Sequence, residues 1–289
     1  MRGGLAGLGL GLVVAVTCAS VALGEGRSSR TARSRSCPSE MAQVEGFCID
    51  RWEIHTVDHR SGRRLSPFYP PSPKLVRRVR VVWEVERHGF GDQASRLVPL
   101  PDLPPVERRT DFEPRAVSSP GVIPQGYLTY YLARQACANA GKRLCTEEEW
   151  VAACRGARQT KYPYGGQYVP GRCNVHRLMH PAFVLHGNSS VGHTDPRLNL
   201  IDESGRDPLL RLTGATPDCR SRWSGGDLYD MVGNLDEWVD DPSGVFVGGF
   251  YARFTEEGCD ARIASHSPLY YDYSLGTRCC RDLPPAAQP

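Results

Sequence analysis

Ten of the eleven cysteines lie after residue 24, and this even set is the feature that most constrains the fold. The run that precedes them, residues 5–23, is apolar, carries no charge and is rich in glycine and alanine. It is typical of a signal peptide over residues 1–24. In an exported chain an even set of cysteines predicts disulfides, and no pair has the Cys-x-x-Cys spacing of a zinc site. We therefore expect a disulfide-stabilised domain.

The leader leaves the final location open among the periplasm, the cell envelope and secretion. A weak lipoprotein cleavage box ends at Cys18, so a lipid anchor there is an alternative. Residues 25–36 form a serine- and arginine-rich arm that we expect to be disordered and exposed. The formal net charge is only +3 and no nucleic-acid-binding motif accompanies it, so we expect no nucleic-acid partner.

The ordered part is predicted to begin with two short strands around a turn at Glu45 and Gly46. Residues 60–120 are rich in proline and are predicted to form an insertion that wraps the body. Within it only residues 79–85 alternate like a strand, and no other regular structure is expected there.

Two helices are predicted further along. Residues 127–140 place apolar side chains on one face and end before Gly141. The second helix starts at Thr146, where Glu149 completes a capping box, and ends at Gly156. Two helices among short strands and many loops indicate an α+β fold with unusually little regular structure.

Residues 228–241 concentrate carboxylates around a tight turn. Asp230 and Glu237 offer hard oxygens, and a kinked backbone at residues 233–235 can turn carbonyls inward. Calcium prefers several such oxygens, some of them from the backbone. The alternative is a solvated acidic turn before a strand.

Six motifs, taken in order, resemble the formylglycine-generating enzyme (sulfatase-modifying factor) family. They are GKRLCTEEEW at 141–150, ACRG at 153–156, YPYG at 162–165, MVGNLDEW at 231–238, GGFY at 248–251 and GTRC at 276–279. The resemblance implies a compact α+β domain over residues 37–283, related to the C-type lectin fold, with bound calcium. Residues 284–289 would be a tail.

The resemblance also implies ligands for two calcium ions. The second site resembles Asp230, Gly233, Leu235 and Glu237. The first site resembles Asn174 and Val175, with Asp195 and Asp202 as candidates for its remaining ligands. The family usually has asparagine where this chain has Asp230, and the added charge favours Ca²⁺.

Family disulfides map onto two cysteine pairs, Cys137–Cys279 and Cys154–Cys259. The other six cysteines are assigned, as a hypothesis, to Cys37–Cys48, Cys173–Cys219 and Cys145–Cys280.

The family's catalytic residues do not carry over. Its enzymes oxidise a substrate cysteine with O₂ and Cu(I), which two thiolates hold just after the GGFY-like strand, and soft thiolates suit Cu(I). Here Arg253 occupies the first thiolate position, and the second has no counterpart because Cys259 matches a structural cysteine. Asp236 replaces a tryptophan. The resemblance therefore implies a degenerate enzyme without copper, whose cleft near Asp236 and Arg253 binds a peptide, protein or glycan.

Two other functions are kept as alternatives. The chain could be an active oxidoreductase with a non-standard site, built from Cys279 and Cys280 or from the histidine loop. That loop contains His176, His180, His186 and His193, of which the first two would share a helical face. The chain could also be a structural cell-envelope protein that its basic arm attaches. Tyr270, Tyr271 and Tyr273 are expected at the surface, and Trp52, Trp150 and Trp238 in the core.

Overall fold

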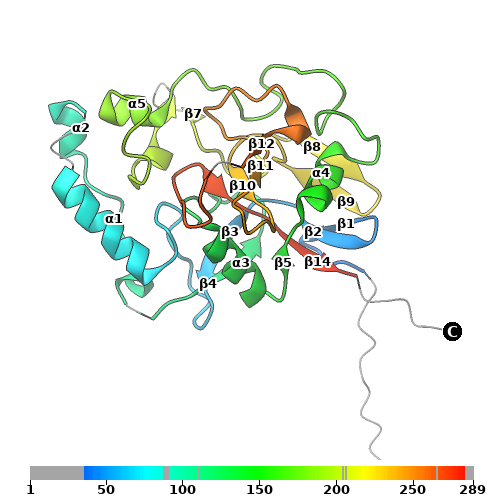
Figure 1. The fold of residues 1–289 in the computed structure, drawn as a ribbon, viewed down its shortest axis with the longest axis horizontal. Coiled ribbons are helices and arrows are strands. Elements are labelled where there is room, and N and C mark those ends of the chain that lie inside the picture. Colours follow the sequence, from blue (N-terminus) through cyan, green and yellow to red (C-terminus); the bar gives the residue numbers. More distant parts are fainter. Residues whose placement is uncertain are drawn as a thin grey trace, which may run out of the picture. The chain divides into compact units, whose positions relative to one another are not determined.

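The computed structural model describes residues 36–86, 91–109, 111–203, 205, 207–264 and 266–283 (Figure 1). The expected signal peptide, Cys18, nearly all of the basic arm and the tail lie outside the described residues. Among the described residues, no helix has the length and apolar character that crossing a membrane requires.

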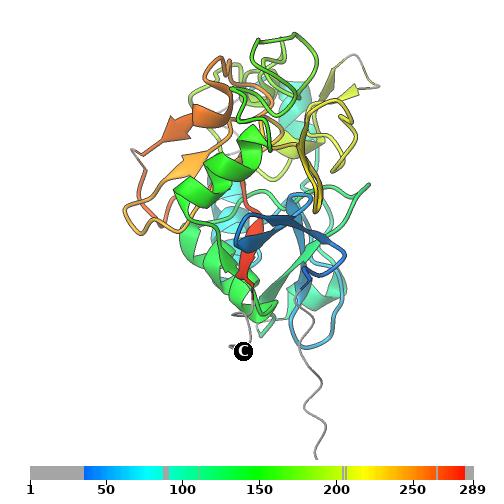
Figure 2. The same cartoon turned by 90° about the vertical axis from the view of Figure 1, so that its right-hand side faces the viewer.

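One antiparallel sheet joins the two ends of the domain. Its order is β1 (Met41–Val44), β2 (Phe47–Asp50), β14 (Cys279–Asp282) and β5 (Arg143–Leu144). The predicted hairpin of β1 and β2 is confirmed, and its turn places Glu45 at φ +46°. Figure 2 shows the first strands, in blue, beside the last strand, in red.

A second sheet carries the acidic turn and the strand that follows it. Its order is β12 (Arg262–Ile263), β11 (Phe246–Val247), β10 (Asp236–Trp238) and β13 (Leu275–Gly276). β10 runs parallel to β13 and antiparallel to β11.

Three two-stranded ribbons complete the strands. They pair β3 (Ile54–Asp58) with β4 (Pro114–Ser118), β6 (Asp202–Glu203) with β7 (Asp207–Pro208), and β8 (Arg220–Trp223) with β9 (Gly226–Tyr229).

The two predicted helices are present. α3 (Tyr130–Asn139) starts after Thr129, whose side chain accepts from the backbone N–H of Leu132, so this helix is shorter than expected. α4 (Glu147–Arg155) has the predicted capping box between Thr146 and Glu149, and it ends at Gly156 with φ +66°. Regular structure is otherwise sparse, which confirms the α+β class.

The prediction of a strand at residues 79–85, with no other regular structure in the insertion, was wrong. Residues 79–85 lie in a helix, α1 (Pro73–Glu86), and α2 (Gln93–Leu97), the 3₁₀ helix η1 (Pro105–Arg108) and β4 follow within the same segment. Val76 and Val79, one helical turn apart, are buried on one side of α1. Burial of this side against the body favours the helix over a strand.

The prediction that His176 and His180 share a helical face was also wrong. His176 has φ +55°, and His180 is only the residue before α5 (Pro181–His186). Two further 3₁₀ turns, η2 (Leu198–Leu200) and η3 (Gly258–Asp260), are the remaining helical elements of the described chain.

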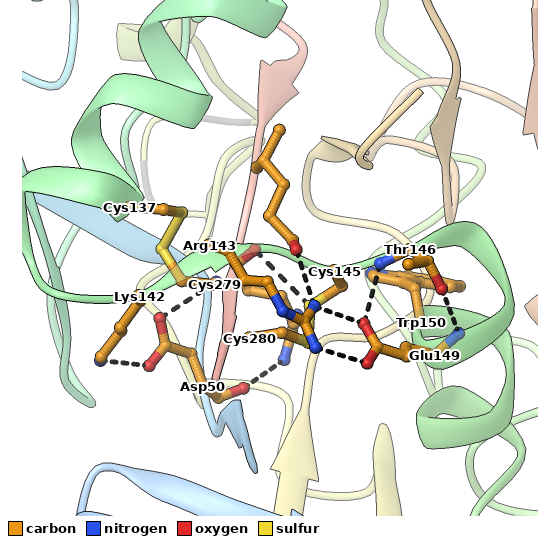
Figure 3. The surroundings of a disulfide bond; sticks show 12 residues. Asp50, Cys137, Lys142, Arg143, Cys145, Thr146, Glu149, Trp150, Cys279 and Cys280 are labelled. Carbon is orange, nitrogen blue, oxygen red and sulfur yellow. Dashed lines mark hydrogen bonds and ion pairs between the residues drawn. A yellow bond between two sulfur atoms is a disulfide. The ribbon is translucent and has the colours of Figure 1, made fainter. Parts of the chain in front are cut away.

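Five disulfides join the pairs that were expected from the sequence. They are Cys37–Cys48, Cys137–Cys279, Cys145–Cys280, Cys154–Cys259 and Cys173–Cys219. Two of them start from neighbouring residues of β14 and reach α3 and the end of β5 (Figure 3). Asp50 accepts from the backbone N–H of Cys279 and pairs with Lys142 at 2.6 Å, so the disulfide region is also held by charge.

Some of the aromatic residues are not buried or exposed as the sequence predicted. Trp150 and Trp238 are buried, whereas Trp52 is half-buried and stacks on Tyr229. Tyr271 and Tyr273 are buried rather than exposed, because residues of the insertion pack into the same hydrophobic cluster and cover them.

The cap of α4 gives a test of this fold. Thr146→Ala removes the acceptor for the Glu149 backbone N–H, and we expect unfolding free energy to fall by about 1 kcal/mol. Urea unfolding followed by circular dichroism measures the change. Glu148→Ala, at an exposed position of the same helical turn, is the control and should cost less. Equal losses for both variants would contradict the role of the cap.

Candidate functional site

The acidic turn is shaped by a glycine that no other residue can replace without a shift. Gly233 has φ +84°, and a Cβ there would lie 2.4 Å from the Asn174 carbonyl oxygen. The Asn234 backbone N–H donates to the same carbonyl at 2.9 Å. The turn therefore brings together segments that were predicted to hold two separate calcium ions, the one at Asn174 and Val175 and the one at residues 230–237.

Two carboxylates of this region already have protein partners. Glu237 accepts from the Trp150 indole at 2.7 Å, and its two oxygens pair with the Arg278 guanidinium at 2.8 to 3.0 Å. Glu53 accepts from the Leu235 backbone N–H at 3.0 Å and from the Asn234 amide at 2.6 Å. Glu53 and Arg278 were not predicted as site residues. Arg278 lies in the GTRC motif at 276–279, so the sequence marks it as part of a family motif. Glu53 lies in none of the six motifs.

The region has an excess of buried negative charge. Glu53, Asp230 and Glu237 are all buried, and they act on one buried guanidinium, Arg278, and one half-buried guanidinium, Arg211. Burial raises the pKa of Asp230 to about 7. Burial, with the charges of Asp230 and Glu237, raises the pKa of Glu53 well above its usual value. Such an excess is relieved by protons or by a bound cation.

The fit of these residues to calcium is uneven. The Asn174 side-chain oxygen is buried and has no hydrogen-bond partner, and Asp230 accepts a hydrogen bond from the Gly214 backbone N–H. These oxygens suit a hard cation. Glu237 fits less well, because the donors of Arg278 and Trp150 already use both its oxygens.

The two candidate aspartates of the first calcium site lie apart from this arrangement. Asp195 is buried and accepts from the Arg197 guanidinium at 2.6 to 3.1 Å, while Asp202 is exposed on β6. Within the described ranges, no three His, Cys, Asp or Glu side chains have the arrangement of a metal centre.

Asp236 and Arg253 form an ion pair where the family resemblance places catalytic groups. One oxygen of Asp236 accepts from Arg253 and from the Gly249 backbone N–H, and the other is buried without a hydrogen-bond partner. Burial raises the pKa of Asp236 to about 7, although Arg253 opposes the rise. We call this pair the Asp236–Arg253 site. Solvent reaches this site at the Arg253 guanidinium, whereas the unpartnered Asp236 oxygen is buried.

Aromatic and imidazole rings surround this pair. The Arg253 guanidinium lies 5.6 Å from the Phe250 ring centroid, and Phe250 meets Tyr273 edge to face. The Tyr273 hydroxyl lies 3.1 Å from His180 Nε2, and the His193 ring lies 5.9 Å from the Tyr273 ring. The sequence pointed to the tyrosines and histidines separately, but Phe250 was missed because it reads as an ordinary strand residue.

No free thiol is present among the described residues, because all ten of their cysteines are in disulfides. Cys279 and Cys280 are fully buried and each is bonded to a different partner. The alternative in which these two residues form a reactive pair was therefore wrong.

Fold and site together define a disulfide-stabilised α+β domain with a buried acidic cluster beside an ion-paired arginine. The model of the sulfatase-modifying factor enzyme 1-like domain matches residues 14–283. The chain therefore belongs to the formylglycine-generating enzyme, or sulfatase-modifying factor, family.

Named relatives include active and inactive members. The formylglycine-generating enzyme of Mus musculus is 25% identical over 86% of this chain and 70% of its own length. The inactive C-alpha-formylglycine-generating enzyme 2 of Bos taurus is 31% identical over 74% of this chain and 66% of its own length. Among solved structures, PvdO from Pseudomonas aeruginosa aligns over 82% of this chain and 80% of its own, with a TM-score of 0.38 and 16% identity.

The raised pKa of Asp236 predicts how stability depends on pH. An aspartate whose pKa is higher in the folded state binds its proton more tightly there, so this contribution is present below about pH 4 and is lost as the pH rises through about 7. Asp236→Asn removes this ionisable carboxyl group, so the variant does not lose its contribution to stability as the pH rises. We expect the stability of the variant relative to the unmodified protein to rise by about 2 kcal/mol between pH 5 and pH 8.

Urea unfolding at pH 5, 6, 7 and 8 measures this difference. Asp202→Asn, which alters an exposed carboxylate, is the control and should show the same pH dependence as the unmodified protein. A constant difference for Asp236→Asn across the series would contradict the prediction.

Proposed function

We propose that this protein is an exported, catalytically degenerate member of its family that binds a ligand at the Asp236–Arg253 site. The observation that carries the proposal is the ion pair itself. A guanidinium occupies the position of the first copper thiolate, and a guanidinium cannot bind Cu(I), which takes soft sulfur ligands.

Two further observations support binding rather than cysteine oxidation, and a third supports export. The ten described cysteines are all used in disulfides, so none supplies a second thiolate. Disulfides also accord with an extracellular or lumenal compartment, which supports export. Finally, a relative that is 31% identical bears the name of an inactive formylglycine-generating enzyme.

The ligand that this site suits carries both a hydrogen-bond acceptor and an apolar or aromatic part. The acceptor would meet the partly exposed Arg253 guanidinium, and the apolar part would lie against the half-buried Phe250 ring. The Arg253 side chain is 28% exposed and the Asp236 side chain only 1%, so a ligand reaches the pair through the guanidinium. A peptide segment has these properties, as does a glycan that offers hydroxyl groups and a sugar face.

We also propose that calcium binds in the acidic region as a structural ion. The residues that would hold it are Asp230 with the turn at Gly233 and Leu235, and Asn174 with Val175. The unpartnered Asn174 oxygen and the excess of buried carboxylates support this. The ion would supply positive charge to the region.

Oxidase chemistry can be tested directly on the purified protein. We expect no stoichiometric copper after reconstitution with Cu(I), and no O₂-dependent conversion of a cysteine-containing peptide. Elemental analysis and mass spectrometry of the peptide measure the two outcomes, with an active formylglycine-generating enzyme as the positive control. Stoichiometric copper together with peptide oxidation would overturn the proposed function.

Calcium removal should lower thermal stability. A protein that binds calcium only when folded is stabilised by the ion, by about 2.7 kcal/mol at a concentration one hundred times Kd. We expect EGTA to lower the unfolding temperature of the unmodified protein, and added Ca²⁺ to restore it.

Asn174→Ala should reduce this calcium response, while Asn188→Ala, in an exposed loop, should keep it. Differential scanning calorimetry with and without EGTA gives the comparison. Identical unfolding temperatures under both conditions would count against a bound calcium ion.

A further inference from the structure

Helix α1 of the insertion presents a concentration of unneutralised positive charge. It contains Lys74, Arg77, Arg78 and Arg80 within seven residues, and all four are exposed. Arg78 and Arg80 line two different grooves, and the groove of Arg80 also contains Glu84. None of them forms an ion pair in the described part of the chain. Other arginines of the domain do form ion pairs, for example Arg177 with Glu203 at 2.6 Å.

A groove of about 380 Å³ lies between α1 and the loop at residues 269–271. Its lining includes Arg78, Val82, His193, Leu269, Tyr270 and Tyr271. Arg78 opposes the rise in the pKa of Tyr271 that burial causes, so its charge acts across the groove. Asp272, next to the lining tyrosines, is engaged by hydrogen bonds from Tyr270 and Ser274.

The rim of this groove is apolar as well as cationic. The Leu269 side chain is 68% exposed, and on α1 the next outward positions, Val81 and Val85, are 63% and 73% exposed. Positive charge beside exposed aliphatic side chains marks a surface that receives both carboxylates and apolar groups.

We propose that this groove, which we call the α1 groove, docks an acidic protein segment in which carboxylate and aliphatic side chains are mixed. A carboxylate would pair with Arg78, the arginine that lines the groove, and the aliphatic side chains would lie on Val82 and Leu269. A sulfated glycan offers the charge but no aliphatic groups for the rim. A flat layer of lipid headgroups would leave the concave groove unfilled.

This inference goes beyond the proposed function, because the α1 groove is lined by α1 and by residues 192–194 and 269–271 and includes neither Asp236 nor Arg253. The two proposals also have different readouts. Copper binding and peptide oxidation would overturn the proposed function without bearing on the α1 groove. Absence of peptide binding would overturn the docking proposal without bearing on copper chemistry.

Fluorescence anisotropy with the full chain and a labelled twelve-residue peptide of alternating glutamate and leucine tests the proposal. We expect saturable binding that weakens as salt rises, because ions screen exposed charges. Arg78→Glu should weaken binding roughly tenfold, since like charges then face each other. Arg222→Glu, an exposed arginine on β8, is the matched control and should bind as the unmodified protein does.

Two further probes separate the components of the interaction. Replacing leucine by serine in the peptide should weaken binding, and replacing glutamate by lysine should abolish it. Circular dichroism of Arg78→Glu shows whether the variant is folded; if it is not, Arg78→Gln replaces it, with a smaller expected loss.

Three outcomes would overturn the proposal. They are peptide binding that Arg78 variants leave unchanged, tighter Arg78-dependent binding to a heparin fragment than to the acidic peptide, and Arg78-dependent binding to phosphatidylserine vesicles without peptide binding.

Discussion

The buried ion pair between Glu237 and Arg278 is the interaction on which the rest of the structure depends. Both side chains are almost fully buried, and the guanidinium also donates to the backbone carbonyls of Asp50 and Tyr229. One side chain therefore connects the end of β2, the end of β9 and strand β10. Removal of one partner of such a pair leaves an uncompensated buried charge, which typically costs about 3–5 kcal/mol.

This arrangement separates the frame of the domain from the candidate site. Glu237, Arg278 and Trp150 hold the frame from one side of β10, and the disulfides hold β14. Asp236 is the neighbour of Glu237 on the same strand, and successive side chains of a strand point to opposite faces. Changes at Asp236 and Arg253 therefore alter the face opposite to the one that fixes the frame.

Features set by local chemistry were predictable from the sequence. The capping box at Thr146 involves residues three positions apart, and the β1–β2 turn needs only its own residues. Arg278 and Glu53 could not be assigned in this way, because their roles depend on partners far along the chain. The error at α1 has the same origin. The valine-rich residues 79–85 fit a strand or a helix, and only the cluster that receives Val76 and Val79 decides between them.

The insertion also changes what the family's site can contact. Val76 and Val79 pack in the same cluster as Tyr271 and Tyr273, so burying α1 also fixes the tyrosines that border the Asp236–Arg253 site. The apolar side of α1 is used for this packing, which leaves its arginines facing outward. A helix that contributes core on one side and uncompensated charge on the other adds a binding surface at little cost to stability, because the apolar burial holds it in place. The Asp236–Arg253 ion pair and the α1 groove are thus held by one packed frame.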